Sequence, residues 1–147
     1  LCTQCPISSS CLSLEFDMVR NIPAKPIKKN KPIKKGYVFF ARVKPNKLLL
    51  ERRPSEGLLG GLLGFPTTKW DVKKNETTFP FMGNWTYTKI VVTHQFSHFK
   101  LELEIVLGEI ETTQFDNSKY LVIESQKFDL LSLPTLMRKV YAKAIKL

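Results

Sequence analysis

Two histidines, two phenylalanines and two hydroxyl residues lie together in the stretch THQFSHF, residues 93–99. Such side chains can act as general bases, as metal ligands or as contacts to nucleic acid. Ser97 and His98 do not suit a serine hydrolase, because neighbouring residues at the start of a strand point to opposite faces. We expect His94 to be a structural histidine that hydrogen-bonds within the fold.

All three cysteines lie near the start of the chain, as Cys2-x2-Cys5-Pro-x5-Cys11. In a sequence with no visible secretion signal, this spacing indicates reduced thiolates bound to zinc or to an iron–sulfur cluster. Both groups normally take four ligands, and the fourth is missing. Since Leu1 is not an initiator methionine, we expect a longer parent chain with the missing ligand upstream. Free thiols left from an incomplete motif are the alternative.

The net charge of +10 is concentrated in one segment, because residues 18–50 hold ten of the 23 basic residues and no acidic residue. Three prolines in the first half of this segment, Pro23, Pro26 and Pro32, disfavour regular structure. The segment therefore predicts a tether beside a polyanion, with a merely solubilising linker as the alternative. The chain divides into residues 1–11 with the cysteines, the linker 12–35, and one compact domain, 36–147.

The elements that must position these side chains are mostly strands. Apolar runs and period-2 alternation predict strands at residues 36–43, 47–53, 90–93, 99–107 and 120–123, with most of residues 67–89 as loop. The pattern also places Phe99 in the core, on the same face as Leu101. Helical spacing of apolar residues from Leu133 to Ile145, with Pro134 in the first turn, predicts a C-terminal helix. The fold class is α+β with a mixed sheet, and no apolar run is long enough to cross a membrane.

Four motifs, in the same order, resemble adenine DNA glycosylases of the MutY family. RRPSEGLLGGLLGFP, residues 52–66, resembles that family's R-P-x-x-G-L-W-G-G-L-W-E-F-P segment, and THQFSHF resembles its H-x-F-S-H-F loop. CTQCPISSSC is similar to the end of the cluster motif of endonuclease III-type glycosylases, and LPTLMRKVY to the family's last helix. Leu59 and Leu63 replace the usual tryptophans and Gly64 the usual glutamate, so we expect looser packing there.

The resemblance implies that residues 36–147 form a MutT-like (Nudix-like) C-terminal domain, with a mixed β-sheet and flanking helices. Such a domain recognises 8-oxoguanine opposite a misincorporated adenine in base-excision repair. The parent glycosylase excises the adenine with residues upstream of the cluster, so this chain is expected to hold no catalytic residue and to be inactive alone.

The resemblance also has implications for cofactor and partner. Cys2, Cys5 and Cys11 would ligate a 4Fe-4S cluster in the parent protein, with no cluster expected in this chain alone. The partner would be double-stranded DNA with an 8-oxoguanine:adenine mispair, bound by a monomer in the bacterial cytoplasm, associated with the nucleoid and not with a membrane.

Within the resembling loop, Ser97 has a chemical reason to recognise an oxidised base. Oxidation turns guanine N7 into an N–H donor and adds a carbonyl at C8. A serine hydroxyl can accept from N7–H while a backbone N–H donates to the new oxygen, and an unmatched polar pair costs roughly 1–3 kcal/mol. Phe96 either stacks beside the base or anchors the loop, and His98 either contacts phosphate or braces the loop.

The rival interpretation is a Nudix hydrolase of oxidised nucleoside triphosphates, because GLLGFP also resembles the start of a Nudix box. That chemistry needs several carboxylates on one helix to hold a divalent cation. A hydrolase would continue with Gly-Gly and later R-E-x-x-E-E. Here Thr67 and Thr68 follow, and only Asp71 and Glu76 are acidic before residue 100. The sequence therefore favours a binding domain.

Overall fold

The computed structural model describes residues 2–24, 30–43, 46–71, 79–110, 116, 118–126 and 129–147. The chain forms two compact units, Leu1–Asn30 and Lys31–Leu147. The first unit contains two 3-10 helices, η1 (Cys2–Gln4) and η2 (Ser8–Ser10), and the short helix α1 (Leu12–Glu15). None of these three elements contains a buried residue.

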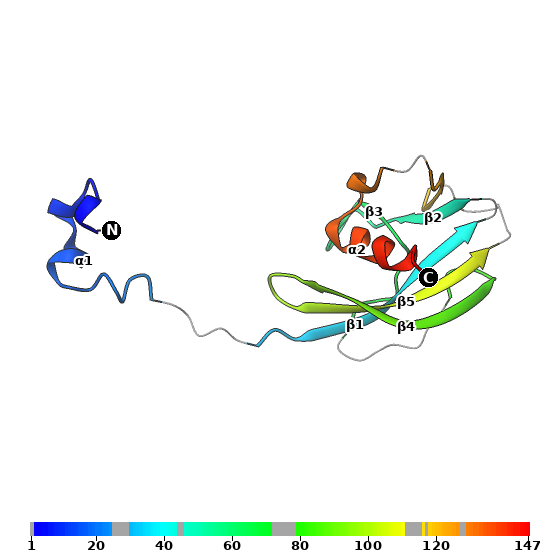
Figure 1. Ribbon diagram of the computed structural model, residues 1–147, viewed down its shortest axis with the longest axis horizontal. Coiled ribbons are helices and arrows are strands. Elements are labelled where there is room, and N and C mark those ends of the chain that lie inside the picture. Colours follow the sequence, from blue (N-terminus) through cyan, green and yellow to red (C-terminus); the bar gives the residue numbers. More distant parts are fainter. Residues whose placement is uncertain are drawn as a thin grey trace. The chain divides into compact units, whose positions relative to one another are not determined.

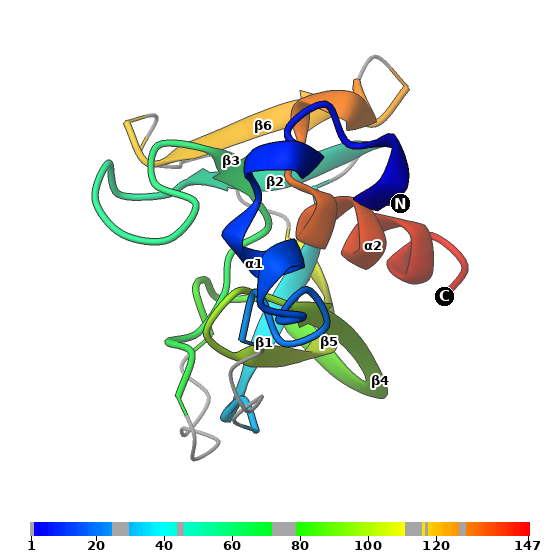
Figure 2. The same ribbon diagram turned by 90° about the vertical axis from the view of Figure 1, so that its left-hand side faces the viewer.

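The second unit is built on a six-stranded mixed sheet with the order β3-β2-β1-β5-β4, and β6 pairs with β2 (Figures 1 and 2). The strands are β1 (Ile33–Val43), β2 (Lys47–Arg52), β3 (Leu63–Gly64), β4 (Asn84–Gln95), β5 (Lys100–Ile110) and β6 (Tyr120–Glu124). β1 and β5 are parallel over their full lengths, and the other pairs are antiparallel. A 3-10 helix, η3 (Leu130–Ser132), precedes the helix α2 (Thr135–Ala144). The predicted α+β class with a mixed sheet and a C-terminal helix is confirmed.

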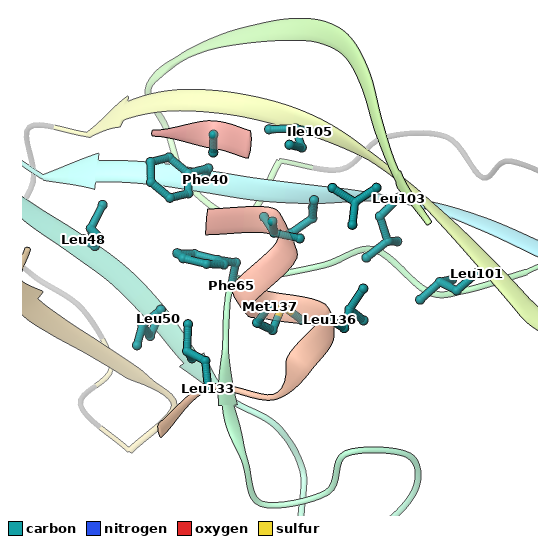
Figure 3. Close-up of a cluster of buried hydrophobic side chains, with 14 residues drawn as sticks. Phe40, Leu48, Leu50, Phe65, Leu101, Leu103, Ile105, Leu133, Leu136 and Met137 are labelled. Carbon is teal, nitrogen blue, oxygen red and sulfur yellow. The ribbon is translucent and has the colours of Figure 1, made fainter. Parts of the chain in front are cut away.

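The central strands are buried on both faces, which explains why β1 and β2 consist of nearly unbroken apolar runs. On one face, α2 covers the main core (Figure 3), which comprises Val38, Phe40, Leu48, Leu50, Phe65, Val92, Leu101, Leu103, Ile105, Leu133, Leu136, Met137, Val140 and Ala144. On the other face, Phe81 and Trp85 pack against a smaller second core of Ala41, Val43, Leu49 and Ile110. Each large side chain that is fully buried in this way contributes about 1.5–3 kcal/mol to folding.

Two exposed lysines of α2 donate hydrogen bonds to backbone carbonyls of β4. Lys143 Nζ donates to the carbonyl of Val91 at 2.8 Å, and Lys139 Nζ to that of Thr93 at 3.4 Å. β4 is an edge strand of the described sheet, so these bonds satisfy carbonyls on the edge where another chain could pair. Among the described residues, no helix has the length and apolar character that a bilayer crossing requires.

Two expectations need correction. Residues 84–89, which the sequence indicated as loop, are the first half of β4. Most of their side chains are at least partly exposed, and the pairing with β5 shifts between Tyr87 and Val91, so no alternating pattern was visible. The linker 12–35 is not wholly irregular, because it contains α1 and the start of β1.

The second core depends on a glycine that lies opposite a tryptophan. Trp85 on β4 pairs with Gly108 on β5, and the indole lies across the glycine. A Cβ atom on residue 108 would meet three atoms of that ring far inside contact distance. The indole is also held by stacking on Phe79 at 5.6 Å between ring centroids and by a hydrogen bond from Nε1 to the carbonyl of Phe81 at 3.0 Å.

Gly108→Ala should therefore destabilise the protein by about 1–3 kcal/mol, the usual cost of overpacking a well-filled core. Urea unfolding measures the loss. Trp85→Leu is the matched partner for a double-mutant cycle, because it removes the ring that the new methyl group would strike. The two losses should be less than additive; full additivity would contradict the steric cause.

Candidate nucleic-acid interface

The residues THQFSHF lie at the turn between β4 and β5, beside the first residues of β1 (Figure 1). The Phe96–Phe99 turn is closed by a hydrogen bond from the N–H of Phe96 to the carbonyl of Phe99 at 2.9 Å. Ser97 and His98 at its tip are exposed, whereas Phe96 and Phe99 are half-buried and pack against the main core. The turn therefore presents two polar side chains on an apolar base.

Phe96 is the anchor of this turn. Its ring stacks on Trp70 at 6.1 Å between centroids and 27° between planes, and lies 4.8 Å from the ring of Phe99. The imidazole of His94 meets its edge at 4.7 Å and 67°. Of the two roles considered for Phe96, the structure places it as the loop anchor. Its ring is engaged on several sides and is not free to stack on a base in this conformation.

Three cations surround the base of the turn. The guanidinium carbon of Arg53 lies 4.7 Å from the centroid of Trp70, and Lys34 Nζ lies 4.9 Å from that of Phe99. Lys31 Nζ donates a hydrogen bond to the carbonyl of Phe96 at 2.9 Å. Positive charge at these distances favours a phosphate backbone next to the turn. Lys31 and Lys34 come from the segment that the sequence indicated as linker, and they are part of this basic rim.

His94 lies directly beneath the turn. Burial lowers the pKa of its imidazole below the ordinary histidine value of 6.5, and the positive charge of Lys139 lowers it further. Its Nδ1 is buried and has no hydrogen-bond partner, and neither has Nε1 of Trp70. His94 thus packs within the fold as a structural residue, and its Nδ1 makes no hydrogen bond to a described residue. An unpartnered buried polar atom costs about 1–3 kcal/mol, so two such atoms around one phenylalanine are unusual.

Sequence reasoning identified Phe96, Ser97 and His98 but missed Trp70 and Arg53. Trp70 lies 26 positions before Phe96, in the region expected to be loop. It comes near the turn because residues 66–71 run along the first half of β1, with isolated bridges from Val38 to Thr67 and from Lys35 to Asp71. No local pattern signals such a pairing, although a tryptophan in a polar stretch was the available clue.

The glycine-rich segment 57–66 begins as a turn and leads into β3 and the main core. Gly57, Leu59 and Gly61 have positive φ angles, which is an unusual conformation for leucine. Leu59 and Leu63 pack against the main core, so both positions are packed although leucine replaces the usual tryptophan at each. At Gly64 a Cβ atom would lie 3.1 Å from atoms of Met137. The methionine of α2 fills the space that a side chain at residue 64 would need.

The carboxylates required for a Nudix hydrolase are not gathered in the part of the chain that the structure describes. No three side chains among its histidines, cysteines, aspartates and glutamates form a group that could hold a metal ion. Asp71 follows Gly-Phe-Pro in an extended segment rather than on a helix, and Glu76 lies outside the described residues. The described residues therefore do not fit a divalent cation, and we derive no hydrolytic step.

The three cysteines of the first unit are free and partly buried. Cys2 and Cys5 are joined through the backbone, since the N–H of Cys5 donates to the carbonyl of Cys2 at 3.1 Å. Over residues 2–24 the structure does not bring Cys2, Cys5 and Cys11 together as a set of metal ligands. The iron–sulfur role of these thiols stays a prediction for a longer chain.

A cavity of about 320 Å³ lies at the other end of the sheet, where β1 ends and β2 begins. Its walls include Phe40, Arg42, Lys47, Glu109 and Ser125. None of its lining residues belongs to the Phe96–Phe99 turn. The volume suits a small ligand. The polar groups that line this cavity are separate from the residues of the Phe96–Phe99 turn.

The lowered pKa of His94 predicts a pH dependence of stability. The folded protein favours the neutral imidazole. The contribution of His94 to the free energy of unfolding is therefore complete above the pKa that this histidine has in the unfolded chain, and it is lost as the pH falls through the lowered pKa of the folded state. His94→Gln should flatten this part of the profile in urea unfolding between about pH 8 and pH 5.

Lys139→Gln should raise the pKa of His94 in an NMR titration, with Lys143→Gln as control. A fall after Lys139→Gln would contradict the electrostatic cause.

Comparison with known proteins agrees with this fold. The family model of the NUDIX domain matches residues 37–143. The solved structure of MutT protein from Methanosarcina mazei Go1 superposes with a TM-score of 0.63 and 14% identity, covering 81% of this chain and 97% of that one. The C-terminal domain of mouse MUTYH, solved in complex with human PCNA, gives a TM-score of 0.58 and 15% identity over 77% of this chain and 88% of that one.

A NUDIX hydrolase from Nitrosomonas europaea is also similar, with a TM-score of 0.54, 11% identity and coverage of 85% of this chain and 76% of that one. At these identities the solved structures establish the fold alone. The match of the family model over most of the mixed sheet and α2 shows that the chain belongs to the NUDIX domain family.

Proposed function

We propose that the chain is the lesion-recognition domain of an A/G-specific adenine DNA glycosylase. It recognises 8-oxoguanine opposite a misincorporated adenine, and a catalytic domain outside this chain excises the adenine. The supporting observation is the Phe96–Phe99 turn, which presents exposed Ser97 and His98 on a packed aromatic base with a basic rim.

The geometry of the turn suits base recognition. The side chains of Ser97 and His98 form no hydrogen bond with another described residue, so their polar groups are available to a ligand. Ser97 Oγ accepts from N7–H of the oxidised base, and a backbone N–H of the turn donates to the C8 oxygen. His98 contacts the phosphate backbone, alongside Lys31 and Lys34. Ordinary guanine has no C8 oxygen, so it leaves the backbone N–H of the turn without an acceptor, and its N7 offers no donor to the serine oxygen.

The choice of parent enzyme depends on motifs more than on fold. MutT from Methanosarcina mazei and the C-terminal domain of mouse MUTYH share the fold with this chain about equally. The H-x-F-S-H-F loop and the glycine-rich segment resemble the MutY family, and the order of cysteines, linker and domain agrees. In the parent protein, Cys2, Cys5 and Cys11 would complete a 4Fe-4S cluster with one further ligand.

A Nudix hydrolase of oxidised nucleoside triphosphates is the alternative, supported by the family match alone. Incubation of the chain with Mg²⁺ and 8-oxo-dGTP distinguishes the two functions. We expect no release of pyrophosphate above the buffer blank, because the described residues hold no group of carboxylates that fits the cation. Turnover that Glu76→Gln abolishes would overturn the recognition role.

The direct test of recognition is Ser97→Ala. The wild-type chain should bind an 8-oxoguanine:adenine duplex more tightly than a guanine:adenine duplex, and the substitution should lower that affinity ratio about ten- to a hundredfold. Fluorescence anisotropy with labelled duplexes measures both affinities at one salt concentration.

The matched control is Ser118→Ala, an exposed serine before β6, which pairs with β2 and not with β4 or β5; this substitution should leave the ratio unchanged. An unchanged ratio in Ser97→Ala would remove the turn as the recognition element. A wild-type chain that binds both duplexes equally would contradict the proposed function itself.

A further inference from the structure

Trp70 lies under the Phe96–Phe99 turn yet belongs to a separate part of the chain. Its neighbours are fixed on the first half of β1, because the N–H of Thr68 donates to the carbonyl of Tyr37 at 3.1 Å. On its other side, Lys35 and Asp71 exchange two backbone hydrogen bonds of 2.7 and 3.2 Å. The backbone of Trp70 is thus held by the sheet and not by the turn.

Two side chains engage the indole. Phe96 stacks at 6.1 Å and 27°, and the guanidinium carbon of Arg53 lies 4.7 Å from the ring centroid. Arg53 is fixed in turn, because Nη1 donates to Oγ1 of Thr67 at 3.4 Å. An indole is the ring that binds a cation best, and its area covers a phenyl ring more fully than leucine does.

The environment of Trp70 is not one that stability alone would favour. Its Nε1 is buried without a hydrogen-bond partner, whereas Nε1 of Trp85, in the second core, donates to the carbonyl of Phe81. An unpartnered donor makes the site less stable than an apolar side chain of similar size would. The indole at residue 70 is therefore not the side chain that core packing alone would favour at this position.

The β4–β5 ladder holds the base of the turn up to Gln95 and Lys100, and the aromatic contact supports the turn itself. Within the described residues, the turn is closed by the bond between Phe96 and Phe99 and held from outside by the single bond from Lys31 Nζ. Because the ring of Phe96 is packed on Trp70 and Phe99, its position affects where the next residue, Ser97, lies. Hydrogen-bond recognition weakens steeply with angle and distance, so a small displacement of Ser97 costs discrimination.

We infer that Trp70 is a positioning residue for lesion recognition: clamped by Arg53, it supports Phe96 and so aims Ser97 at the oxidised edge of the base. This inference rests on the proposed function. Trp70 touches no DNA in this role and acts through Phe96. The contact surface is made by the turn, and its geometry is determined by a residue of the segment that runs beside β1.

The test compares Trp70→Leu and Trp70→Phe with the control Trp85→Leu, all in the complete chain. Two quantities are measured: amide hydrogen exchange of the protein alone, by NMR, and the ratio of affinities for 8-oxoguanine:adenine and guanine:adenine duplexes. Trp70→Leu should speed exchange at Phe96 about tenfold while Leu103 in the main core changes much less. The affinity ratio should fall about tenfold, with binding to the guanine:adenine duplex nearly unchanged.

Trp70→Phe keeps an aromatic face and should recover most of both quantities, and it replaces the leucine variant if that protein does not fold. Trp85→Leu should destabilise the domain but keep the affinity ratio. Unchanged exchange at Phe96 in Trp70→Leu, or an equal rise at Phe96 and Leu103, would overturn the inference, since the second result describes a purely structural residue. A wild-type chain without discrimination would refute the proposed function, and exchange at Phe96 would still decide whether Trp70 positions the turn.

Discussion

The parallel pairing of β1 with β5 is the constraint on which the second unit depends. The two strands stay in register from Ile33 beside Lys100 to Val43 beside Ile110. This pairing places two apolar strands in the middle of the sheet, where α2 and Phe65 cover one face and Trp85 and Phe81 cover the other. It also determines the functional geometry, because the chain enters the domain beside the turn that precedes β5, and the N–H of Lys100 bonds to the carbonyl of Pro32.

That register explains why a basic segment and an aromatic turn lie together. Lys31 and Lys34 come just before and just after the first paired residue of β1, so they reach the carbonyl of Phe96 and the ring of Phe99. A lysine that only tethered the domain would not need such contacts. The same strands end at the opposite side of the sheet, near the cavity lined by Arg42 and Glu109. The fold thus separates the turn from the cavity by the full length of β1.

Local patterns predicted the elements whose burial is periodic. β5 and α2 each have a buried stripe, and the apolar runs of β1 and β2 follow from burial on both faces. The order of apolar and polar residues in these elements therefore predicts their secondary structure. The first half of β4 could not be recognised, because an edge strand with exposed side chains has no such stripe. The turn itself was identified by motif, whereas its support by Trp70 and Arg53 depends on contacts between distant segments that no window of sequence contains.

Under the proposed function, the anchored turn gives a physical reason why a NUDIX fold can serve as a binding domain. A mobile loop would lose conformational entropy on binding DNA, about 1–2 kcal/mol for each residue that becomes ordered. In this structure the rings of Phe96 and Phe99 are already packed, so little ordering is left for the bound state. Discrimination between two bases that differ at N7 and C8 needs a rigid donor and acceptor pair more than it needs contact area. Because Trp70 and the sheet support the turn on its buried side, Ser97 and His98 stay exposed beside the basic rim.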